Sequence, residues 1–255
     1  MYKIDLNCDL GESFGRYTLG NDSEVLPLIT SANVACGFHA SDPQVMERTV
    51  ASAKQCGVRI GAHPGFPDLV GFGRRNLAVS PDEARADLLY QLGALDAFAR
   101  TQGVRLQHVK PHGALYNMAA KDAALAQALC DAIRSFDDNL IVLALAGGEL
   151  ARAAQQAGLR TALEFFADRA YEEDGSLVNR RKPGALIEDE EQAIARTLRM
   201  VKEGKLTAIT GKDIDVHAHS VCVHGDGAKA LEFVRKIRAA FEQEGISICA
   251  LDEIV

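Results

Sequence analysis

Short apolar segments rich in β-branched residues alternate with helical segments along almost the whole 255-residue chain. The strand-like segments are 2–9, 32–38, 58–63, 106–110, 140–146, 161–167 and 220–224, with a weak eighth near 246–251. Alternation of this kind is typical of parallel βαβ units. Seven or eight repeats over this length favour a closed barrel over an open sheet. We therefore predict a single domain over residues 1–255, a (β/α) barrel of seven or eight parallel strands, with an extra hairpin near 204–219 where the alternation breaks.

The helical segments between these strands carry start and stop signals. Ser41-Asp42-Pro43 supplies a cap and a first-turn proline, and Gly57 ends that helix. Ser80-Pro81-Asp82-Glu83 starts a second helix that ends near Gly103. Further helices are predicted over 122–136, 149–157, 189–203 and 228–244.

One face of several strands is polar, although a buried parallel strand is normally apolar on both faces. Side chains alternate between the two faces of a strand. In the first and fourth strands the polar positions of one parity are Asp5, Asn7, Asp9, His108, Lys110 and His112. Enzymes with a barrel of this kind place their active sites at the carboxyl ends of the strands. We therefore expect polar side chains from five strands to meet at one end of the barrel, namely Asp9, His63, Lys110, His112, Asp168, His224 and Asp226.

Each of these residues, taken alone, is more often a capping or hydrogen-bonded structural group. Asp5 and His108 lie nearer the strand starts and are expected to be structural. For Asn33 the structural alternative is a side chain that bonds only backbone. Pro111 is expected to face the surrounding helices. The convergence of charges favours a functional site, because unpaired charges there would destabilise the fold.

The sequence offers candidate metal ligands but no nucleotide-binding motif. His108 and His112 are four residues apart, but four residues along a strand separate side chains by roughly 13 Å. Asp9, His39 and His63 could bind a divalent metal from separate strands. The chain has neither a Walker phosphate loop nor a GxSxG nucleophile motif.

A local basic run, Asn179-Arg180-Arg181-Lys182, follows Arg169 in a chain of net charge −7. It is either a solvated loop or a clamp for a carboxylate or phosphate, since guanidinium groups bind both in a bidentate manner. The acidic balance of the whole chain argues against general binding to nucleic acid or to anionic membranes.

The start of the chain lacks the pattern of a signal peptide, and the longest apolar run, 140–146, is too short to cross a bilayer. Six cysteines are scattered without a CxxC pair. We therefore predict a cytoplasmic protein with six reduced thiols.

Six motifs resemble those of the LamB/YcsF family in sequence and in order: DLNCDLGE, NVACGFHA, GAHPGFPD, VKPHGALYN, EFFADRAY and VCVHGD. The resemblance extends from Asp5 to Asp226. It implies a distorted, TIM-like barrel related to the glycoside hydrolase and sugar deacetylase barrels. It also implies ATP-dependent opening of 5-oxoproline to L-glutamate by a 5-oxoprolinase, in which a chain of this family works together with B and C subunits.

With this resemblance, the polar positions are divided into two predicted sets. The predicted catalytic residues are Asp9, His63, Lys110, His112, His224 and Asp226. The predicted substrate-binding residues are Asn7, Glu12, Asn33, His39, Tyr116, Asp168, Arg169 and Arg180. ATP is expected as a co-substrate of the complex, bound with the partner subunits. Two alternatives stay open: a stand-alone metal-dependent amide or acetyl hydrolase, and a non-catalytic substrate-binding subunit.

Overall fold

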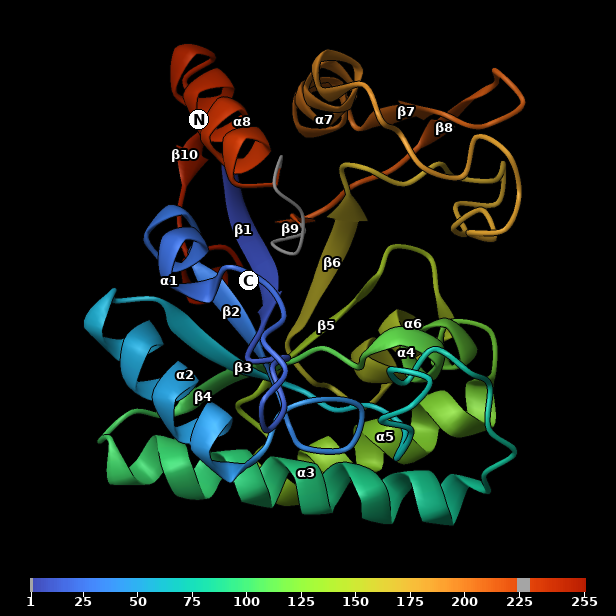
Figure 1. Cartoon of the computed structure of the whole chain (residues 1–255). Coiled ribbons are helices and arrows are strands. Elements are labelled where there is room, and N and C mark those ends of the chain that lie inside the picture. The colour runs from blue at the N-terminus through green and yellow to red at the C-terminus, as the bar shows by residue number, and fades with distance from the viewer. Residues whose placement is uncertain (1, 224–229) are drawn as a thin grey trace.

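Seven parallel strands close into a ring in the computed structural model of the chain, which describes residues 2–223 and 230–255. Around the ring the order is β1 (Lys3–Leu10), β2 (Ser31–Ala35), β3 (Arg59–His63), β4 (Leu106–Val109), β5 (Ile141–Leu145), β6 (Thr161–Phe166) and β9 (Ser220–Cys222). β9 pairs back with β1 and closes the barrel. A short strand, β10 (Ser247–Ile248), pairs in parallel with the start of β1 (Figure 1). The predicted barrel of seven or eight parallel strands is confirmed.

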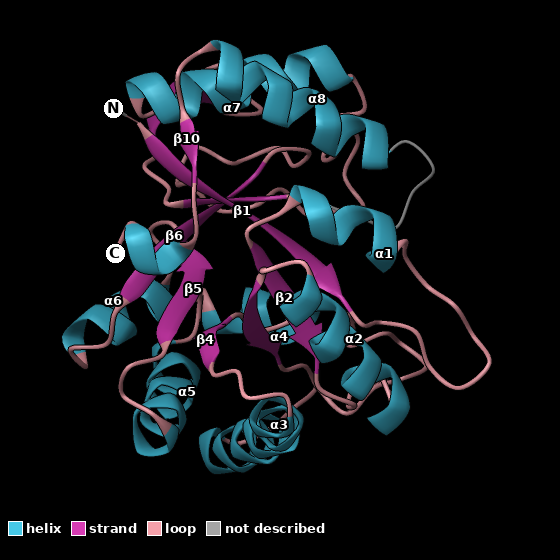
Figure 2. Ribbon diagram, turned by 90° about the vertical axis from the view of Figure 1, so that its left-hand side faces the viewer, coloured by secondary structure: helices cyan, strands magenta, loops and turns pink. Residues whose placement is uncertain are grey.

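Helices cover the outside of this ring, as two views at right angles show (Figures 1 and 2). In the described part of the chain they are α1 (Asp22–Val25), α2 (Pro43–Gln55), α3 (Pro81–Thr101), α4 (Gly113–Ala119), α5 (Ala123–Phe136), α6 (Glu149–Gln156), α7 (Glu190–Glu203) and α8 (Ala230–Gln243), with the 3-10 helices η1 (Leu26–Leu28) and η2 (Leu251–Glu253). None of the helices among these residues is long and apolar enough to cross a membrane.

The predicted helix starts are formed by the expected caps. The Asp42 side chain accepts hydrogen bonds from two amides of the first turn of α2, and Pro43 occupies the first position of that helix. Ser80 and Glu83 form a reciprocal capping box at the start of α3. These local signals fix where two of the outer helices begin.

The connection from β6 to β9 is the longest departure from the βαβ pattern. It contains α7 and then an antiparallel pair, β7 (Lys205–Thr207) and β8 (Asp213–Asp215). These elements lie together beyond the carboxyl end of β6 (Figure 1). The loop between β6 and α7 carries the basic run singled out in the sequence.

Side chains on the two faces of β1 have different surroundings. Ile4, Leu6 and Cys8 belong to the apolar core and are fully buried. Asn7 is also fully buried, but its side chain donates to Ser220 of β9 and accepts from Asn33 of β2, so it points into the ring. Polar side chains therefore fill much of the barrel interior, where branched apolar residues are usual.

One glycine makes room for this polar interior. A Cβ atom at Gly61 of β3 would lie 2.1 Å from His108 Nε2. The absence of a side chain there lets the His108 imidazole pack directly against the neighbouring strand.

Candidate active site

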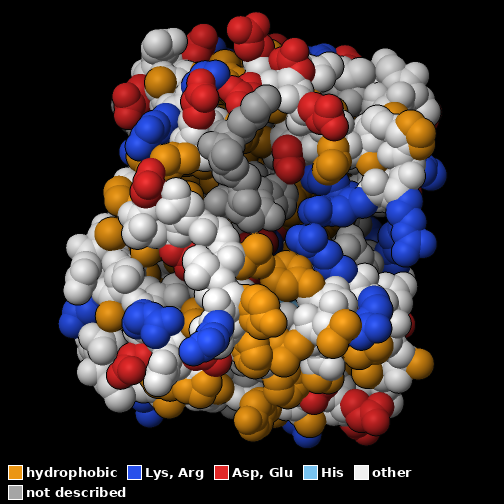
Figure 3. Space-filling model, in the orientation of Figure 1, with side chains coloured by type: hydrophobic (Ala, Val, Ile, Leu, Met, Phe, Trp, Pro, Cys, Tyr) orange, Lys and Arg blue, Asp and Glu red, His pale blue; other side chains and the backbone are white. Residues whose placement is uncertain are grey.

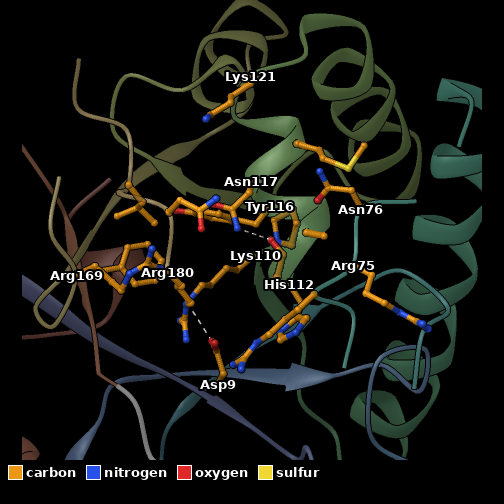
Figure 4. A pocket seen from close by; sticks show the side chains of 18 of the residues that line it. Asp9, Arg75, Asn76, Lys110, His112, Tyr116, Asn117, Lys121, Arg169 and Arg180 are labelled. Carbon is orange, nitrogen blue, oxygen red and sulfur yellow. Dashed lines mark hydrogen bonds and ion pairs between the residues drawn. The ribbon is translucent and has the colours of Figure 1, made fainter. Parts of the chain in front are cut away.

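A cavity of about 930 Å³ opens at the carboxyl ends of the barrel strands. Asp9 comes from the end of β1 and His63 from the end of β3, whereas Lys110 and His112 follow β4 directly. Phe166, at the end of β6, completes this side of the lining. Strand ends that are far apart in the sequence thus supply one wall of the cavity (Figure 4).

Cationic side chains dominate the cavity lining: Arg74, Arg75, Lys110, Lys121, Arg169, Arg180 and Arg181. The carboxylates of the described lining are those of Asp9 and Asp122. Asp122 is used as the cap of α5, where its Oδ1 accepts from the amides of Ala124 and Leu125. Lys and Arg side chains gather beside a hollow on this face of the molecule (Figure 3). The cavity therefore favours an anionic ligand, with Asp9 as the carboxylate that faces it.

Lys110 forms the charged floor of the cavity. Its Nζ lies 3.0 Å from Asp9 Oδ1 and 2.7 Å from Glu164 Oε1, and its side chain is only 3 % exposed. Burial opposes the charge of this amine, yet Asp9 and Glu164 together hold the pKa of Lys110 well above its usual range. Lys110 is therefore a fixed positive charge next to the cavity.

A layer of buried amides lies below Lys110. Asn7 Oδ1 accepts from Lys110 Nζ at 3.1 Å, and Asn33 Nδ2 donates to both Asn7 and Asp9. Asn33 Oδ1 in turn accepts from His108 Nε2 at 2.7 Å. The alternative in which Asn33 bonds only backbone is wrong, because its side chain links side chains from β1 and β4.

Asp5 and His108 lie deeper in the barrel and away from the cavity lining. The Asp5 carboxylate accepts from the hydroxyls of Thr30, Ser31 and Ser220. Burial raises the pKa of Asp5 to about 6, although these hydrogen bonds oppose the shift. Burial also lowers the pKa of His108 to about 3, so this imidazole is neutral. Both residues are packed as the structural groups that the sequence predicted.

Glu164, at the floor of the site, was omitted from the sequence predictions. It is fully buried on β6, where its Oε1 pairs with Lys110 and its Oε2 accepts from the Tyr116 hydroxyl at 2.8 Å. Burial and the adjacent Glu164 raise the pKa of Tyr116 well above its usual range. The signal was present in the sequence, because Glu164 shares its strand parity with Phe166 and Asp168.

Three histidines and Glu12 form a second cluster beside Asp9. Donor atoms of Glu12, His39, His63 and His112 all lie within 4.8 Å of one another. His112 Nδ1 lies 3.0 Å from His63 Nε2, and His39 Nε2 lies 3.1 Å from Glu12 Oε1. The imidazoles of His39 and His112 stack with centroids 3.7 Å apart.

Burial is the main cause of the low basicity of two of these rings. It lowers the pKa of His39 well below the usual range, and the neighbouring His63 adds to the effect. Burial likewise lowers the pKa of His112 well below its usual range, with contributions from His39 and His63. Both rings are therefore neutral at physiological pH.

Backbone geometry holds His112 in place. Phe72 adopts a positive φ of 54°, which is costly for a bulky side chain, and its carbonyl accepts from His112 Nε2 at 2.8 Å. The next residue, Gly73, passes so close that a Cβ atom there would lie 2.7 Å from His39 Cβ and 2.9 Å from His112 Cδ2. The 64–80 loop is thus shaped around the histidine cluster.

Two of the predicted arginines reach the cavity from the loop after β6. Arg169 is 5 % exposed and donates to the Val178 carbonyl, and among the described residues its Nε has no hydrogen-bond partner. Burial lowers the pKa of Arg169 to about 10, and the nearby Arg180 adds to this shift. Arg180 itself is exposed. Guanidinium groups that crowd one another at a cavity provide a site for an anion.

The remaining predicted residues fall into three groups. Tyr116 lines the cavity, whereas Asn7, Glu12, Asn33, His39 and Asp168 are absent from the described lining and lie behind it or beside it. His224 and Asp226 lie outside the described residues.

Pro111 was expected to face the surrounding helices, and this expectation is wrong, because Pro111 lines the cavity. The strand β4 ends at Val109, so the alternation of side chains between two faces does not extend to Pro111.

Comparisons with known proteins agree with this architecture. The model of the LamB/YcsF family matches residues 4–255. A Clostridium beijerinckii protein, named as the A subunit of 5-oxoprolinase, is 64 % identical over 254 residues, covering 100 % of both chains. A Campylobacter jejuni protein of the same name is 58 % identical over 255 residues, again covering 100 % of both.

Solved structures show the same barrel. A crystal structure of a lactam utilization protein from Thermus thermophilus superposes with a TM-score of 0.93 at 49 % identity, covering 97 % of this chain and 99 % of that one. A family 4 carbohydrate esterase from Streptomyces lividans has a TM-score of 0.52 at 9 % identity, covering 97 % of this chain and 91 % of that one, and shares the fold alone. The family match over nearly all residues and the full-length relatives show that the chain belongs to the LamB/YcsF family.

Proposed function

We propose that this chain is one component of an ATP-dependent 5-oxoprolinase that opens the lactam of 5-oxo-L-proline to L-glutamate, with ATP hydrolysed to ADP and phosphate, together with B and C subunits. Full-length relatives named as the A subunit of 5-oxoprolinase support the proposal. The observation that carries it is the cavity at the strand ends, where Lys110 and Asp9 meet under a cationic rim. Such a cavity suits a small anionic amide.

The substrate carboxylate is assigned to the basic side of the cavity. Arg169 is buried with an unpaired Nε among the described residues, and exposed Arg180 lies on the same wall. A charged hydrogen bond from a guanidinium group fixes both the position and the orientation of a carboxylate. This contact would turn the lactam carbonyl toward the floor of the cavity.

Lactam opening requires a base for water, a positive group for the developing oxyanion and a proton for the leaving nitrogen. Asp9 is the proposed base, because Asp122 is used as a helix cap and Asp9 has a 21 % exposed side chain at the cavity. Asp9 would take a proton from water as the water oxygen attacks the carbonyl carbon. As the carbon–nitrogen bond breaks, the same proton would pass from Asp9 to the nitrogen.

Lys110 is the proposed electrostatic partner of the oxyanion. Its ammonium group is already ordered by Asp9, Glu164 and Asn7, so it needs no rearrangement when negative charge develops. A fixed charge of this kind is worth most in a site with little water. Asn7 and Asn33, which lie behind Lys110, are proposed to position the lysine and Asp9.

Use of ATP is assigned to the complex and not to this cavity alone. Because the chain lacks a Walker phosphate loop, phosphorylation is assigned to the partner subunits. A phosphorylated intermediate would carry more negative charge than 5-oxoproline, and the arginines and lysines of the rim suit such a ligand. The division of labour predicts that the isolated chain does not use ATP to open the lactam.

The test is an assay of L-glutamate release from 5-oxoproline with ATP, using the purified chain alone and with its B and C subunits. We expect turnover only with all three subunits, and a fall of roughly a hundred-fold or more for Asp9→Asn in an intact complex. ATP-dependent turnover by the chain alone would contradict the division of labour. No turnover by the assembled complex would contradict the function itself.

A second candidate function is a metal-dependent amide or acetyl hydrolase that works alone. The cluster of Glu12 and three histidines beside the cavity favours it. This enzyme would release product without ATP and without partner subunits. The same assay, run without ATP, separates the two functions. A non-catalytic binding subunit would be indicated if Asp9→Asn left the turnover of the assembled complex unchanged.

A further inference from the structure

The hydrogen bonds of His63 and His112 determine which ring nitrogen of each carries a proton. His63 Nδ1 lies 2.7 Å from the Lys110 carbonyl, and His112 Nε2 lies 2.8 Å from the Phe72 carbonyl. A carbonyl oxygen can only accept, so both of these nitrogens must donate. In neutral rings the opposite nitrogens, His63 Nε2 and His112 Nδ1, then carry lone pairs.

These two lone pairs point at the same place. His63 Nε2 and His112 Nδ1 are only 3.0 Å apart, and the two ring planes are nearly perpendicular, at 89°. Two acceptors this close repel each other unless a proton or a metal cation lies between them. The geometry of the two rings therefore calls for a positive species.

Glu12 brings a third donor atom to the same point. Its Oε1 lies 3.5 Å from His112 Nδ1. Donor atoms bound to one tetrahedral zinc ion at about 2.0–2.1 Å lie about 3.3 Å from one another. The separations of 3.0 Å between the imidazole nitrogens and 3.5 Å to the carboxylate bracket that value.

His39 belongs to the cluster but is poorly placed to be a ligand. Its ring is parallel to that of His112, with an interplanar angle of 3° and centroids 3.7 Å apart. A metal ion lies in the plane of an imidazole that binds it, and one ion cannot lie in both of two stacked planes. His39 Nε2 instead donates to Glu12 Oε1 at 3.1 Å and orients that carboxylate.

We propose that Glu12 Oε1, His63 Nε2 and His112 Nδ1 bind one divalent transition-metal ion of the zinc type, with one coordination position open toward the cavity. Imidazole and carboxylate ligands suit such ions. Each ligand is held by an outer partner, namely His39, the Lys110 carbonyl and the Phe72 carbonyl, as is usual for metal-binding histidines and carboxylates.

The open position would face the cavity, because His63 and His112 both line it. Asp9 Oδ2 lies 3.3 Å from His63 Nε2, so a molecule bound at the open position would contact the carboxylate assigned as the base. The site stands on this geometry and does not depend on the proposed 5-oxoprolinase activity.

The test is direct metal binding by the full chain without ATP or partner subunits. After removal of metal with a chelator, we expect calorimetric titration with Zn²⁺ to give one site per chain. Co²⁺ in the same site should give visible absorption bands of a four- or five-coordinate ion. His112→Gln and Glu12→Gln should each weaken Zn²⁺ binding by a hundred-fold or more. His39→Gln should cost less, about ten-fold, because outer partners contribute about that much.

A matched control is His217→Gln, which removes an exposed histidine outside the cluster and should leave Zn²⁺ binding unchanged. If His112→Gln fails to fold, the partly exposed Glu12 offers the second variant, and X-ray absorption of the zinc-loaded wild type should show two imidazole ligands. No binding to the wild type, or binding that Glu12→Gln and His112→Gln leave unchanged, would overturn the proposal. A doubly protonated His63 that persists in protein saturated with Zn²⁺, seen by nitrogen NMR, would also overturn it and would assign the cluster to a shared proton.

Discussion

Glu164 Oε1 lies 2.7 Å from Lys110 Nζ at the floor of the cavity, and their side chains are 0 and 3 % exposed. Asp9 also pairs with Lys110, but its side chain is 21 % exposed and faces the cavity. The two carboxylates therefore have different surroundings. Glu164 is the fully buried partner of Lys110, while Asp9 lies at the cavity, where we propose that the substrate binds.

This arrangement predicts that Lys110→Met strands the Glu164 carboxylate without a counter-ion. Loss of one partner of a buried pair typically lowers the free energy of unfolding by about 3–5 kcal/mol. The double variant Lys110→Met/Glu164→Gln should regain most of that loss, because no buried charge is left unpaired. Urea unfolding of the two single variants and the double variant measures the coupling.

Turnover should behave differently from stability in the same variants. The double variant lacks the positive charge assigned to the oxyanion, so its activity in the complex should stay low even when its stability is restored. If the double variant is no more stable than Lys110→Met, then the Glu164 carboxylate does not need Lys110 as its counter-ion. Near-normal turnover of the double variant would remove Lys110 from the mechanism.

A second prediction concerns Arg169 and Arg180, two of the arginines that line the cavity. Arg180→Ala should weaken the apparent affinity of the complex for 5-oxoproline by about ten-fold or more, since a charged hydrogen bond is worth about 1.5–3 kcal/mol. Arg180 is exposed, so the variant should keep its fold. Arg169→Ala should weaken affinity as well, but it also loses a hydrogen bond to Val178 and is expected to lower stability.

The matched control for the rim is Arg134→Ala. Arg134 is an exposed arginine near the end of α5, it pairs with Asp131, and it is not part of the described cavity lining. Its loss changes the net charge by the same amount as Arg180→Ala. Equal KM values for wild type, Arg180→Ala and Arg134→Ala would show that Arg180 does not bind the substrate and that the basic run is a solvated surface loop.

The sequence predicted the barrel and the strand-borne part of the site because strand side chains alternate with a fixed period. The alternation places Lys110 on the same inward face as Asn7 and Asp9, and its ammonium group contacts both of them. The alternation stops where a strand stops, which is why Pro111 was placed on the wrong side.

The loop-borne part of the site follows no such period. Arg74 and Phe72 belong to a loop whose path depends on tertiary packing, including a positive φ at Phe72, and sequence periodicity contains no information about it. Glu12 and His39 also lie outside strands. The approach of His39 to His63 was suspected from the strand ends, whereas that of Glu12 could be suspected only from the family motifs. Glu164 was visible by parity but was passed over for residues nearer the strand ends.

A third prediction concerns the thiols. All six cysteines are free, with Cys8, Cys36, Cys130 and Cys222 buried and Cys56 exposed. Burial raises the pKa of Cys36 and of Cys130 to about 12, which makes these thiols unreactive. A thiol reagent should therefore modify Cys56 rapidly in the native protein and all six cysteines after denaturation. Modification of fewer than six cysteines after denaturation would refute the prediction of a cytoplasmic protein with six reduced thiols.

The last prediction concerns the pH dependence of stability set by Asp5. Its pKa of about 6 in the folded protein is raised by burial above the ordinary value of about 3.9 for the unfolded chain. The folded state therefore binds a proton more tightly than the unfolded state, and this contribution to stability is complete below about pH 4. This contribution is lost as the pH rises from about 4 through 6. The folded and unfolded pKa values differ by about 2, so the loss amounts to roughly 3 kcal/mol in the free energy of unfolding.

Asp5→Asn should remove this dependence, because an amide resembles the protonated acid and keeps an oxygen for the hydroxyls of Thr30 and Ser31. The variant should be more stable than wild type at pH 7, and the difference should shrink toward zero as the pH falls from 6 to 4. Urea unfolding of both proteins across this range measures the difference and cancels the other titrating groups. Asp138→Asn, at an exposed position, controls for the loss of one negative charge. A difference between Asp5→Asn and wild type that stays constant from pH 4 to pH 7 would show that Asp5 is not the group that titrates.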